Sequence, residues 1–479
     1  MAAKRTNKIP FNVKMGFGAG ALSYGIPFQM LSGLVIYYAT SVLGISGTLT
    51  GSIYALSIVW DAVTDPIMGY ISDKTNPKIL FGRRLFYVFI GAIGIAISNF
   101  LLWNISPLYS PIIKAFTLGF LLILVKTFST VLTTPYLALG SELSSDYTER
   151  TSVQAFRTAY FFLGFMFPTV VGFGFFFRPT SAYPIGQNNP EAYSYLGLVS
   201  SIIVLVCAAV CIFLTYRFMY KKTDTTRHEK PERRSVIDML KSTGVALKEA
   251  NFRNASLGLL FVNMAMGVVG AVGMHTFTYT FGFNNFQIAI IFGSLFIMAL
   301  IAQPLWVMIS NRFEKKKALI ACLIINLVIS VTFLLFTLYS DIISMHYIAV
   351  LPLSISMGFS MGGAIAMPYA MISDTIDQDA FNTGVRKEGL FYGCATFMYK
   401  LSQSLSVFLV GTMIDLIGFK AGTIQPHAVY VKLGMILPVS FLCCFIIALV
   451  FISRYNLSRA KVLEYQRKLN LLPQDGDDA

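Results

Sequence analysis

The chain has 479 residues, of which 55% are hydrophobic and only 13% are charged, against about 25% charged in an ordinary soluble domain. Its mean hydropathy is +0.66, so it has too little polar surface for a soluble body of this size. This composition excludes a soluble enzyme, a disordered chain and a nucleic-acid-binding protein. The net charge of +14 indicates basic loops that face anionic lipid. The sequence therefore predicts an integral membrane protein.

Apolar runs of the length that crosses a bilayer, roughly 20 residues each, occur twelve times. The first run is interpreted as a retained helix, because it is longer than a signal-peptide core and no small-residue cleavage site follows it. The first six cover about residues 15–43, 47–72, 85–105, 111–139, 150–177 and 195–219. The second six cover about residues 255–282, 285–309, 318–339, 342–373, 388–417 and 427–454.

A polar segment of alternating charge separates the two sets of helices. We therefore expect an N-terminal six-helix bundle at 1–219, a cytoplasmic linker at 220–253, a C-terminal six-helix bundle at 254–454 and a cytoplasmic tail at 455–479. Most of the 37 Lys and Arg fall in loops on the side of both termini, which places both termini in the cytoplasm. The prediction is an all-α, multi-pass protein of the cytoplasmic membrane with 12 transmembrane helices.

A short motif repeats between the two sets. The fourth helix ends in Thr134-Pro135-Tyr136 and the tenth in Met367-Pro368-Tyr369, 233 residues further on. Two similar halves related by an axis along the membrane normal would place a binding site between them at the bilayer midplane.

Ionisable side chains in the middle of membrane helices cost several kcal/mol unless they are paired or hydrated, so they are functional candidates. Asp61 and Asp65 are four residues apart and share one helical face. Lys126 shares a face of the fourth helix with Thr130 and Thr133. The remaining candidates are Arg157, His275 and Lys400. The alternative is that these groups form packing salt bridges, and that His275 is hydrogen-bonded to a neighbouring helix.

The segment from Trp60-Asp61 to Asp65-Pro66, followed by Gly69 and Asp73, resembles the glycoside–pentoside–hexuronide:cation symporters. This family belongs to the major facilitator superfamily and includes the melibiose carriers. The resemblance continues at Gly82-Arg83-Arg84, Pro135-Tyr136, Glu149-Arg150, Arg157, Thr383-Gly384-Val385-Arg386-Lys387-Glu388-Gly389 and Lys400.

The resemblance implies a major facilitator fold in two six-helix bundles that takes up a glycoside or related polyol with a cation. It implies that Asp61 and Asp65 bind the cation, that Lys400 links the cation and sugar sites, and that Arg157 binds sugar hydroxyls. It implies a cytoplasmic gate at Asp73, Arg83, Glu149, Arg150, Asp374, Asp377, Arg386 and Glu388.

The chain also departs from the melibiose carriers. Their aspartates on helices 1 and 4 are Ser23 and Thr133 here, and their stacking tryptophans are Leu137 and Ile365. A glycine close to their sodium ion is Lys126. Melibiose itself is therefore not the expected solute. We include in the predicted solute site Arg157, Ser23, Tyr24, Tyr136, Leu137, Asn263, His275, Ile365, Thr396 and Tyr399.

Two carboxylates face two lysines in this site, so the cluster is neutral without a metal ion, whereas a sodium site needs surplus negative oxygen ligands. We hypothesise that Lys126 takes the role of the sodium ion as a tethered cation. We therefore expect no cofactor and no resident metal, and coupling to H⁺ rather than Na⁺ through Asp61 and Asp65, with Lys126, Lys400, Thr130 and Thr133 around them.

The first interpretation is a secondary active transporter, working by alternating access, for a glycoside, oligosaccharide or uronide. The alternatives are a carrier for a lipid-like solute, which Leu137 and Ile365 favour, a sodium-coupled sugar symporter, an uncoupled facilitator and a non-transporting sensor or enzyme. We expect the partners to be a small-molecule solute and the lipid bilayer, with no nucleic acid, and the chain to act as a monomer.

Overall fold

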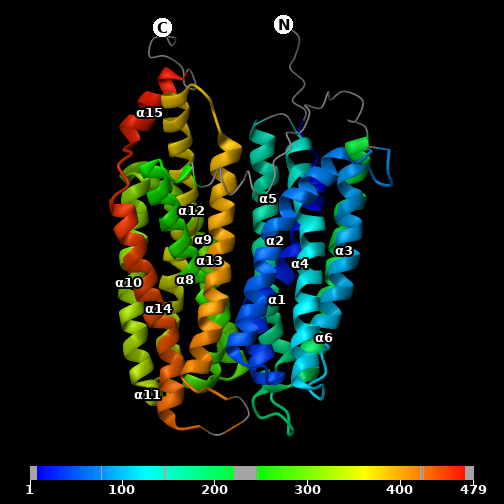
Figure 1. The fold of residues 1–479 in the computed structure, drawn as a ribbon, viewed down its shortest axis with the longest axis vertical. Coiled ribbons are helices and arrows are strands. Elements are labelled where there is room, and N and C mark those ends of the chain that lie inside the picture. Colours follow the sequence, from blue (N-terminus) through cyan, green and yellow to red (C-terminus); the bar gives the residue numbers. More distant parts are fainter. Residues whose placement is uncertain are drawn as a thin grey trace.

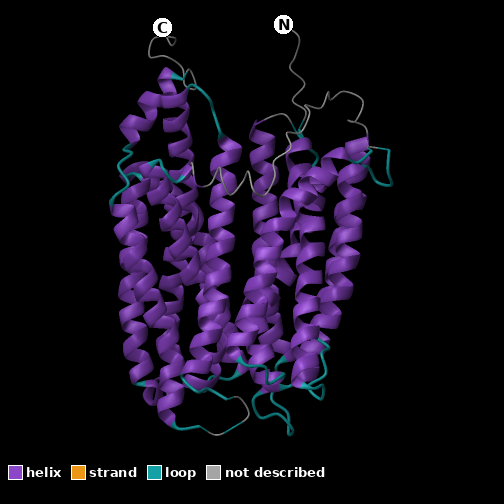
Figure 2. Cartoon of the chain, viewed as in Figure 1, coloured by secondary structure: helices purple, strands orange, loops and turns teal. Residues whose placement is uncertain are grey.

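Within the described residues, twelve helices of 20 residues or more lie side by side (Figures 1 and 2). The computed structural model describes residues 8–76, 78–144, 147–220, 244, 246–420, 423 and 425–469, without the side chains of Ser141, Tyr147, Thr148, Arg150, Thr151, Met219 and Tyr220. The first half of the chain contains α1 (Phe11–Tyr37), α2 (Gly47–Lys74), α3 (Arg83–Leu102), α4 (Pro111–Glu142), α5 (Tyr147–Met166) and α6 (Pro190–Tyr220). The second half contains α8 (Ala250–His275), α9 (Asn285–Phe313), α10 (Lys315–Leu338), α12 (Leu351–Thr383), α13 (Glu388–Leu416) and α14 (His427–Ser453).

The all-α fold predicted from the sequence is confirmed, since the described residues contain no strand. Ten of the twelve helices are long and apolar enough to cross a membrane. The other two, α2 and α13, carry Asp61, Asp65 and Lys400 in their middle. The crossing of all twelve helices and the cytoplasmic position of both termini stay predictions.

The two halves of the chain repeat the same helix packing. In the first half, α1 packs against α5 and α6, and α3 packs against α4 and α6. In the second half, α8 packs against α13 and α14, and α10 packs against α12 and α14. Both α1 and α8 continue into a π-helical segment of five residues, at Tyr38–Val42 and Thr276–Thr280. The internal repeat predicted from a short motif therefore extends to the arrangement of the helices.

The helix ends follow signals in the local sequence. Ser110 caps α4, where its side chain accepts a hydrogen bond from the Ile113 amide. Asn284 and Gln287 form a capping box at the start of α9. Gly384 ends α12 at a φ of 70°, a conformation that glycine adopts without the steric cost of a side chain.

The predicted helix at 342–373 is the one whose bounds the structure changes most. A short helix, α11 (Ser340–Met345), and a 3-10 turn (Tyr347–Val350) precede α12. Pro352 stands in the first turn of α12, where its missing amide hydrogen costs nothing. The helix then runs on to Thr383, because ion pairs stabilise its polar last turns.

Most of the predicted linker, residues 221–243 and 245, lies outside the described residues, as does the end of the predicted tail, 470–479. Within the described part of the tail, residues Arg459–Lys468 form a further helix, α15, which packs against α12 (Figure 1). The end of α12 that leads to α13 and the end of α14 that leads to α15 therefore lie close together, at one end of the second half.

Candidate transport site

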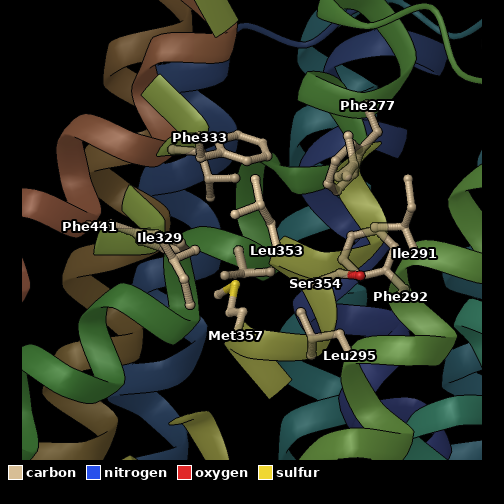
Figure 3. A pocket seen from close by; sticks show the side chains of 13 residues that line it. Phe277, Ile291, Phe292, Leu295, Ile329, Phe333, Leu353, Ser354, Met357 and Phe441 are labelled. Atoms are coloured by element: carbon tan, nitrogen blue, oxygen red, sulfur yellow. The ribbon is translucent and has the colours of Figure 1, made fainter. Parts of the chain in front are cut away.

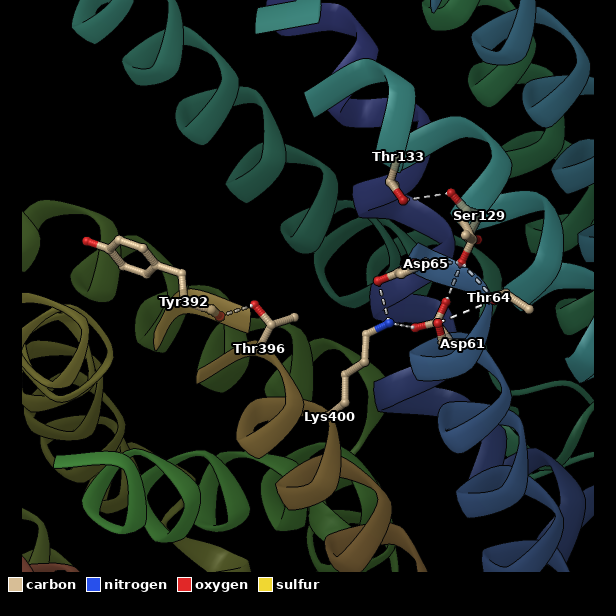
Figure 4. Close-up of polar contacts among 9 residues, drawn as sticks. Asp61, Thr64, Asp65, Ser129, Thr133, Tyr392, Thr396 and Lys400 are labelled. Atoms are coloured by element: carbon tan, nitrogen blue, oxygen red, sulfur yellow. Dashed lines mark hydrogen bonds and ion pairs between the residues drawn. The ribbon is translucent and has the colours of Figure 1, made fainter. Parts of the chain in front are cut away.

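Two carboxylates and one lysine meet midway along the helices, between the two halves. The Lys400 Nζ on α13 lies 2.9 Å from Asp61 Oδ2 and 2.6 Å from Asp65 Oδ2, both on α2. Figure 4 shows the lysine side chain reaching across to the two carboxylates. The cluster is well shielded from solvent, with Asp65 the most exposed of the three at 34%. This group ties the first half of the chain to the second.

Helix α4 supplies the other side of this cluster. The Thr130 Oγ1 lies 2.8 Å from Asp61 Oδ1 and 2.9 Å from Asp65 Oδ1. Thr64, on the same helix as the carboxylates, is 3.5 Å from the Thr130 hydroxyl. The four-residue spacing in α2 therefore brings both acids to one face, as predicted, and that face meets α4 and α13 together. Thr133 turns instead to its own helix and donates to the Ser129 carbonyl.

Of the two lysines expected beside the carboxylates, only Lys400 contacts them. Lys126 is 7% exposed and its ammonium lies 5.6 Å from the centre of the Phe28 ring on α1. Within the described part of the chain, it forms no hydrogen bond and no ion pair. It is still close enough to Asp61 to interact electrostatically. Lys126 therefore does not fill the place between the carboxylates that the tethered-cation hypothesis gave it.

Arg157 on α5 lies beside the aromatic side chains of α1 and α4. Its guanidinium interacts electrostatically with the hydroxyls of Tyr24 and Tyr136. One turn further along α5, Phe161 packs against Tyr24 with ring centres 5.3 Å apart. Leu137, which was predicted at the solute site, is 42% exposed. Arg157, Tyr24 and Leu137 thus stay candidates for contact with a solute.

Three of the predicted solute-binding residues are buried inside their own half in this conformation. The hydroxyl of Ser23 donates to the Val204 carbonyl, and the hydroxyl of Tyr136 donates to the Phe17 carbonyl at 2.5 Å. The Asn263 amide donates back to the Leu259 carbonyl of its own helix. The Ser23 and Tyr136 hydroxyls thus join neighbouring helices, whereas the Asn263 amide bonds within α8.

The second half contributes the remaining predicted residues around the carboxylates. Tyr399 precedes Lys400 on α13 and interacts electrostatically with Asp61. Thr396 is exposed one turn away and donates to the Tyr392 carbonyl (Figure 4). Ile365 on α12 is half-buried. Thr396 and Tyr399 therefore extend the site along the face of α13 that carries the lysine.

His275 was predicted at the solute site, but the structure brings it to a different contact. Its Nε2 lies 2.8 Å from the Thr40 Oγ1 of the first half, and its ring lies 4.7 Å from that of Tyr37. The Tyr37 and Tyr279 hydroxyls both donate to Asn188 Oδ1, at 2.8 and 3.1 Å. His275 therefore belongs to a contact between the halves at the end of the bundle away from α15.

Backbone contacts close the same end. A Cβ atom on Gly411 of α13 would lie 2.2 Å from the Gly47 carbonyl oxygen of α2, and one on Gly51 would lie 2.6 Å from the Val407 carbonyl. The Asp415 carboxylate accepts hydrogen bonds of 2.7 Å from the Gly47 and Thr48 amides. It thereby satisfies the free amides at the start of α2 from the other half. The sequence analysis missed these residues.

The predicted gate residues lie at the opposite end of the bundle, the end that carries α15. They form ion pairs within their own halves. In the first half, Asp73 pairs with Arg84 at 2.6 Å and Arg83 with Glu142 at 2.9 Å. Glu149 pairs with Lys14 at 2.9 Å. The side chain of Arg150 lies outside the described residues.

The second half closes a matching set of ion pairs. Asp374 pairs with Lys315 at 2.6 Å, and Arg386 pairs with Asp377 at 3.0 Å and Glu388 at 2.6 Å. The hydrogen bond that the Arg386 guanidinium donates to Glu388 raises the pKa of Arg386, which lies in the loop before α13. At this end, every ion pair between two described side chains joins residues of one half. The gate residues are thus present, but they do not join the halves here.

Glu142, Lys315 and Gln466 also belong to this end, although sequence reasoning did not name them. Gln466 on α15 donates to Asp377 Oδ2 at 2.7 Å. The signal for Glu142 was an acid seven residues after Pro135, close to the place of Asp374 six residues after Pro368. For Gln466 the sequence held no signal, because a polar residue in a basic tail has many possible partners.

A separate cavity of about 30 Å³ lies inside the second half (Figure 3). Its walls are apolar except for Ser354, whose hydroxyl lies 2.8 Å from that of Ser294. The share of liquid volume that one water molecule takes is about as large. The cavity is lined chiefly by Phe277, Ile291, Phe292, Phe333, Leu353 and Met357. Its walls are too apolar to hold a sugar.

Two matching helical halves, tied midway by charged side chains, are the architecture of a membrane carrier whose binding site lies between repeats. Residues 16–459 match the protein family described as MFS/sugar transport protein. The chain belongs to this family and is a member of the glycoside–pentoside–hexuronide:cation symporters of the major facilitator superfamily. It is a multi-pass membrane transporter of small molecules and not an enzyme.

The names of two relatives of this chain refer to different solutes. The putative glycoside/cation symporter YagG of Escherichia coli K12 is 25% identical over 472 residues, covering 95% of this chain and 94% of the relative. The sodium-dependent lysophosphatidylcholine symporter 1-A of Danio rerio is 23% identical over 494 residues, covering 97% and 89%. Among solved structures, a bacterial homolog of the human lysosomal transporter Spinster, inward-facing and unoccupied, matches with a TM-score of 0.67 at 12% identity over 95% of this chain and 99% of that one.

Proposed function

We propose that this protein is a secondary active transporter for a glycoside, oligosaccharide or uronide, and that protons drive it through Asp61 and Asp65. The observation that carries the proposal is the position of a single hydroxyl, that of Thr130, between the two carboxylates. The proposal makes one chain the working unit, because both halves and the whole charged cluster belong to it.

If Asp61 and Asp65 are both ionised, the two short contacts of the Thr130 hydroxyl cannot both be hydrogen bonds, because one proton is missing. A hydroxyl has one proton to donate, yet the Thr130 Oγ1 is within 2.9 Å of an oxygen on each carboxylate. The Thr64 hydroxyl lies 3.3 Å from the Asp61 carbonyl oxygen and 3.5 Å from the Thr130 hydroxyl, so its one proton goes to one of these two oxygens rather than to a carboxylate. Both short contacts are favourable when one carboxyl is protonated and donates to Thr130. The geometry thus supports a cluster that holds one proton.

The charges around the carboxylates favour protons over sodium ions. The Lys400 ammonium fills the space between the two Oδ2 atoms, where a metal ion would need oxygen ligands. Lys126 adds a second positive charge at longer range, and the phenols of Tyr54 and Tyr399 face Asp61 without charge. Two carboxylates and two lysines balance without a metal ion. A sodium-coupled sugar symporter stays the alternative.

Protonation would act directly on the contact between the halves. Lys400 belongs to α13 and the carboxylates to α2, so their ion pairs hold the two halves together midway along the helices. A proton on Asp65 removes one of the two charges that attract the ammonium. The halves then separate more easily at this level, and the solute and proton cross together when the halves rock between two arrangements. The closed end in this structure is the one away from α15, which supports a state open toward the termini.

Transport by the purified protein in proteoliposomes tests this proposal. We expect a pH gradient with the acidic side outside the vesicles to drive accumulation of a glycoside or uronide inside, while a sodium gradient at constant pH does not. Asp65→Asn should retain exchange of solute across the membrane but lose accumulation driven by pH. The exposed acid Asp341, at 83%, provides the control Asp341→Asn, which should behave as the parent. Accumulation driven by sodium and indifferent to pH would replace this proposal with its alternative.

A second candidate function is transport of a lipid-like solute. It is favoured by the exposed apolar side chain of Leu137, and by the relative that is a lysophosphatidylcholine symporter. Uptake of a lysolipid without uptake of any glycoside or uronide would support it.

A further inference from the structure

We infer that the transported solute is an anion, and that Lys126 and Arg157 together compensate the charge of its acidic group. This inference rests on the proposed transport function and adds the chemical class of the solute. It gives Lys126 a part in solute binding besides its effect on the carboxylates.

Lys126 is a buried cation without a hydrogen-bond acceptor. Lys126 is 7% exposed, and its ammonium lies over the Phe28 ring, 5.6 Å from the ring centre. An ammonium has three protons to donate, and within the described residues none of the three meets a protein oxygen. A buried charge in this condition costs several kcal/mol. A site that keeps such a group has a use for its free donors.

Arg157 is in the same condition. Its Nε is buried and has no hydrogen-bond partner, and no ion pair joins its guanidinium to a described carboxylate. The guanidinium interacts electrostatically with the phenol groups of Tyr24 and Tyr136. The planar guanidinium therefore keeps its donors for a group that the protein does not supply.

The two cations flank one aromatic surface. Phe28, which lies under the Lys126 ammonium, is 5.6 Å from Phe165 and 6.1 Å from Phe161, measured between ring centres. Phe161 stands one turn from Arg157 on α5 and packs against Tyr24. Tyr24 and Phe28 are in turn one helical turn apart on α1, roughly 6 Å along the axis. An acidic group that lies on these rings therefore has Lys126 on one side and Arg157 on the other.

The charge of the whole site explains why an anion fits. Among the described side chains of the site, the cations Lys126, Lys400 and Arg157 outnumber the carboxylates of Asp61 and Asp65, which leaves an excess of one positive charge. Uptake of the coupling proton by a carboxyl raises the excess to two. An anionic solute lowers it again, so proton and solute bind more tightly together than either does alone. A neutral glycoside would leave both cations uncompensated.

The acidic group can come from two sources, the carboxylate of a uronide or the phosphate of a lysolipid. Matched ligand pairs separate them: methyl β-glucuronide against methyl β-glucoside, and lysophosphatidate against a monoacylglycerol of the same chain. We would measure their binding to the purified protein by calorimetry. We expect the acidic member of at least one pair to bind about 10-fold tighter or more, the size of one charge-assisted hydrogen bond.

Variants then assign that preference to the two residues. Lys126→Gln and Arg157→Gln should each weaken binding of the acidic ligand about 10-fold more than they weaken binding of its neutral partner, as for loss of a charged contact. Lys126→Arg, which keeps the charge, should retain most of the preference. Lys317, which is exposed at 71%, gives the control Lys317→Gln, with no change expected.

Equal binding of both members of each pair would overturn the inference, and so would a preference for the acid that survives in Lys126→Gln and Arg157→Gln. Failure of the proposed function has a different signature. If the acidic ligand binds as expected but a pH gradient does not drive its accumulation, proton coupling is refuted and the anion site stands. If only the lysophosphatidate pair shows the preference, the site again stands and a sugar solute is refuted.

Discussion

Replacing Lys400 with methionine removes the ammonium that joins both carboxylates and leaves a side chain of similar length. At an effective dielectric constant of about 20, contacts of 2.9 and 2.6 Å correspond to roughly 6 kcal/mol of attraction each. Much of this attraction is offset by the loss of hydration, and removing one partner of a buried pair costs about 3–5 kcal/mol. Because Asp65 is 34% exposed, solvent screens its part. We expect Lys400→Met to lower the free energy of unfolding by about 3 kcal/mol.

The dependence of this loss on pH identifies its cause. In Lys400→Met, two neighbouring carboxylates repel each other, so the folded protein binds a proton more readily than the unfolded chain does. The loss should therefore be full at mildly alkaline pH and should shrink on acidification. The double variant Lys400→Met/Asp65→Asn should regain most of the stability at alkaline pH, because one charge then remains. Thermal unfolding followed by circular dichroism at two pH values measures this. A loss that is equal at both pH values and persists in the double variant would refute the electrostatic account.

Three further predictions concern the ends of the bundle. Gly411→Ala places a Cβ atom 2.2 Å from the Gly47 carbonyl and should open the end away from α15, measured as faster labelling of a cysteine introduced at Thr40. Gly174→Ala, where nothing lies within 4 Å, is its control and should label like the parent. Asp415→Ala should remove about 1 kcal/mol of helix capping and raise the same labelling rate. Glu142→Gln should remove the charged contacts to Arg83 and Arg84 and lower the free energy of unfolding by about 2 kcal/mol. The unfolding temperature should fall as a result, and an unchanged temperature would contradict the assigned ion pairs.

The sequence was sufficient to predict the pair of acids and their shared face. The helical repeat fixes the relation of Asp61 to Asp65 within one helix, whatever the tertiary structure. The position of Lys400 beside them followed from the family resemblance. The different roles of the two lysines were not predictable, because they depend on how α4 and α13 are placed against α2. In the structure, Thr130 contacts the acids, whereas Lys126, one turn earlier on the same face of α4, lies over the Phe28 ring.

The limits of the helices were predictable where a local signal ends them and less so elsewhere. The segment at 285–309 begins at a capping box, and its predicted start is correct. The segment at 342–373 failed because an apolar run continued through a short helix and a 3-10 turn that hydropathy does not distinguish. The buried positions of Ser23, Tyr136 and Asn263 were also hidden, since a polar side chain in a membrane helix can face a solute or a neighbouring carbonyl.

The contact between α2 and α13 connects the chemistry at the middle of the site with the closed end. Midway, the contact is an ion pair that a proton weakens. At the end away from α15 it consists of glycine backbones and of the Asp415 carboxylate on the start of α2. In the proposed mechanism, a shift of α2 that follows protonation would be transmitted along the helix to a contact made mostly of backbone, with few side-chain atoms to absorb it. Because close-packed backbones do not deform gradually, the end either stays closed or separates, which is the two-state behaviour that alternating access requires.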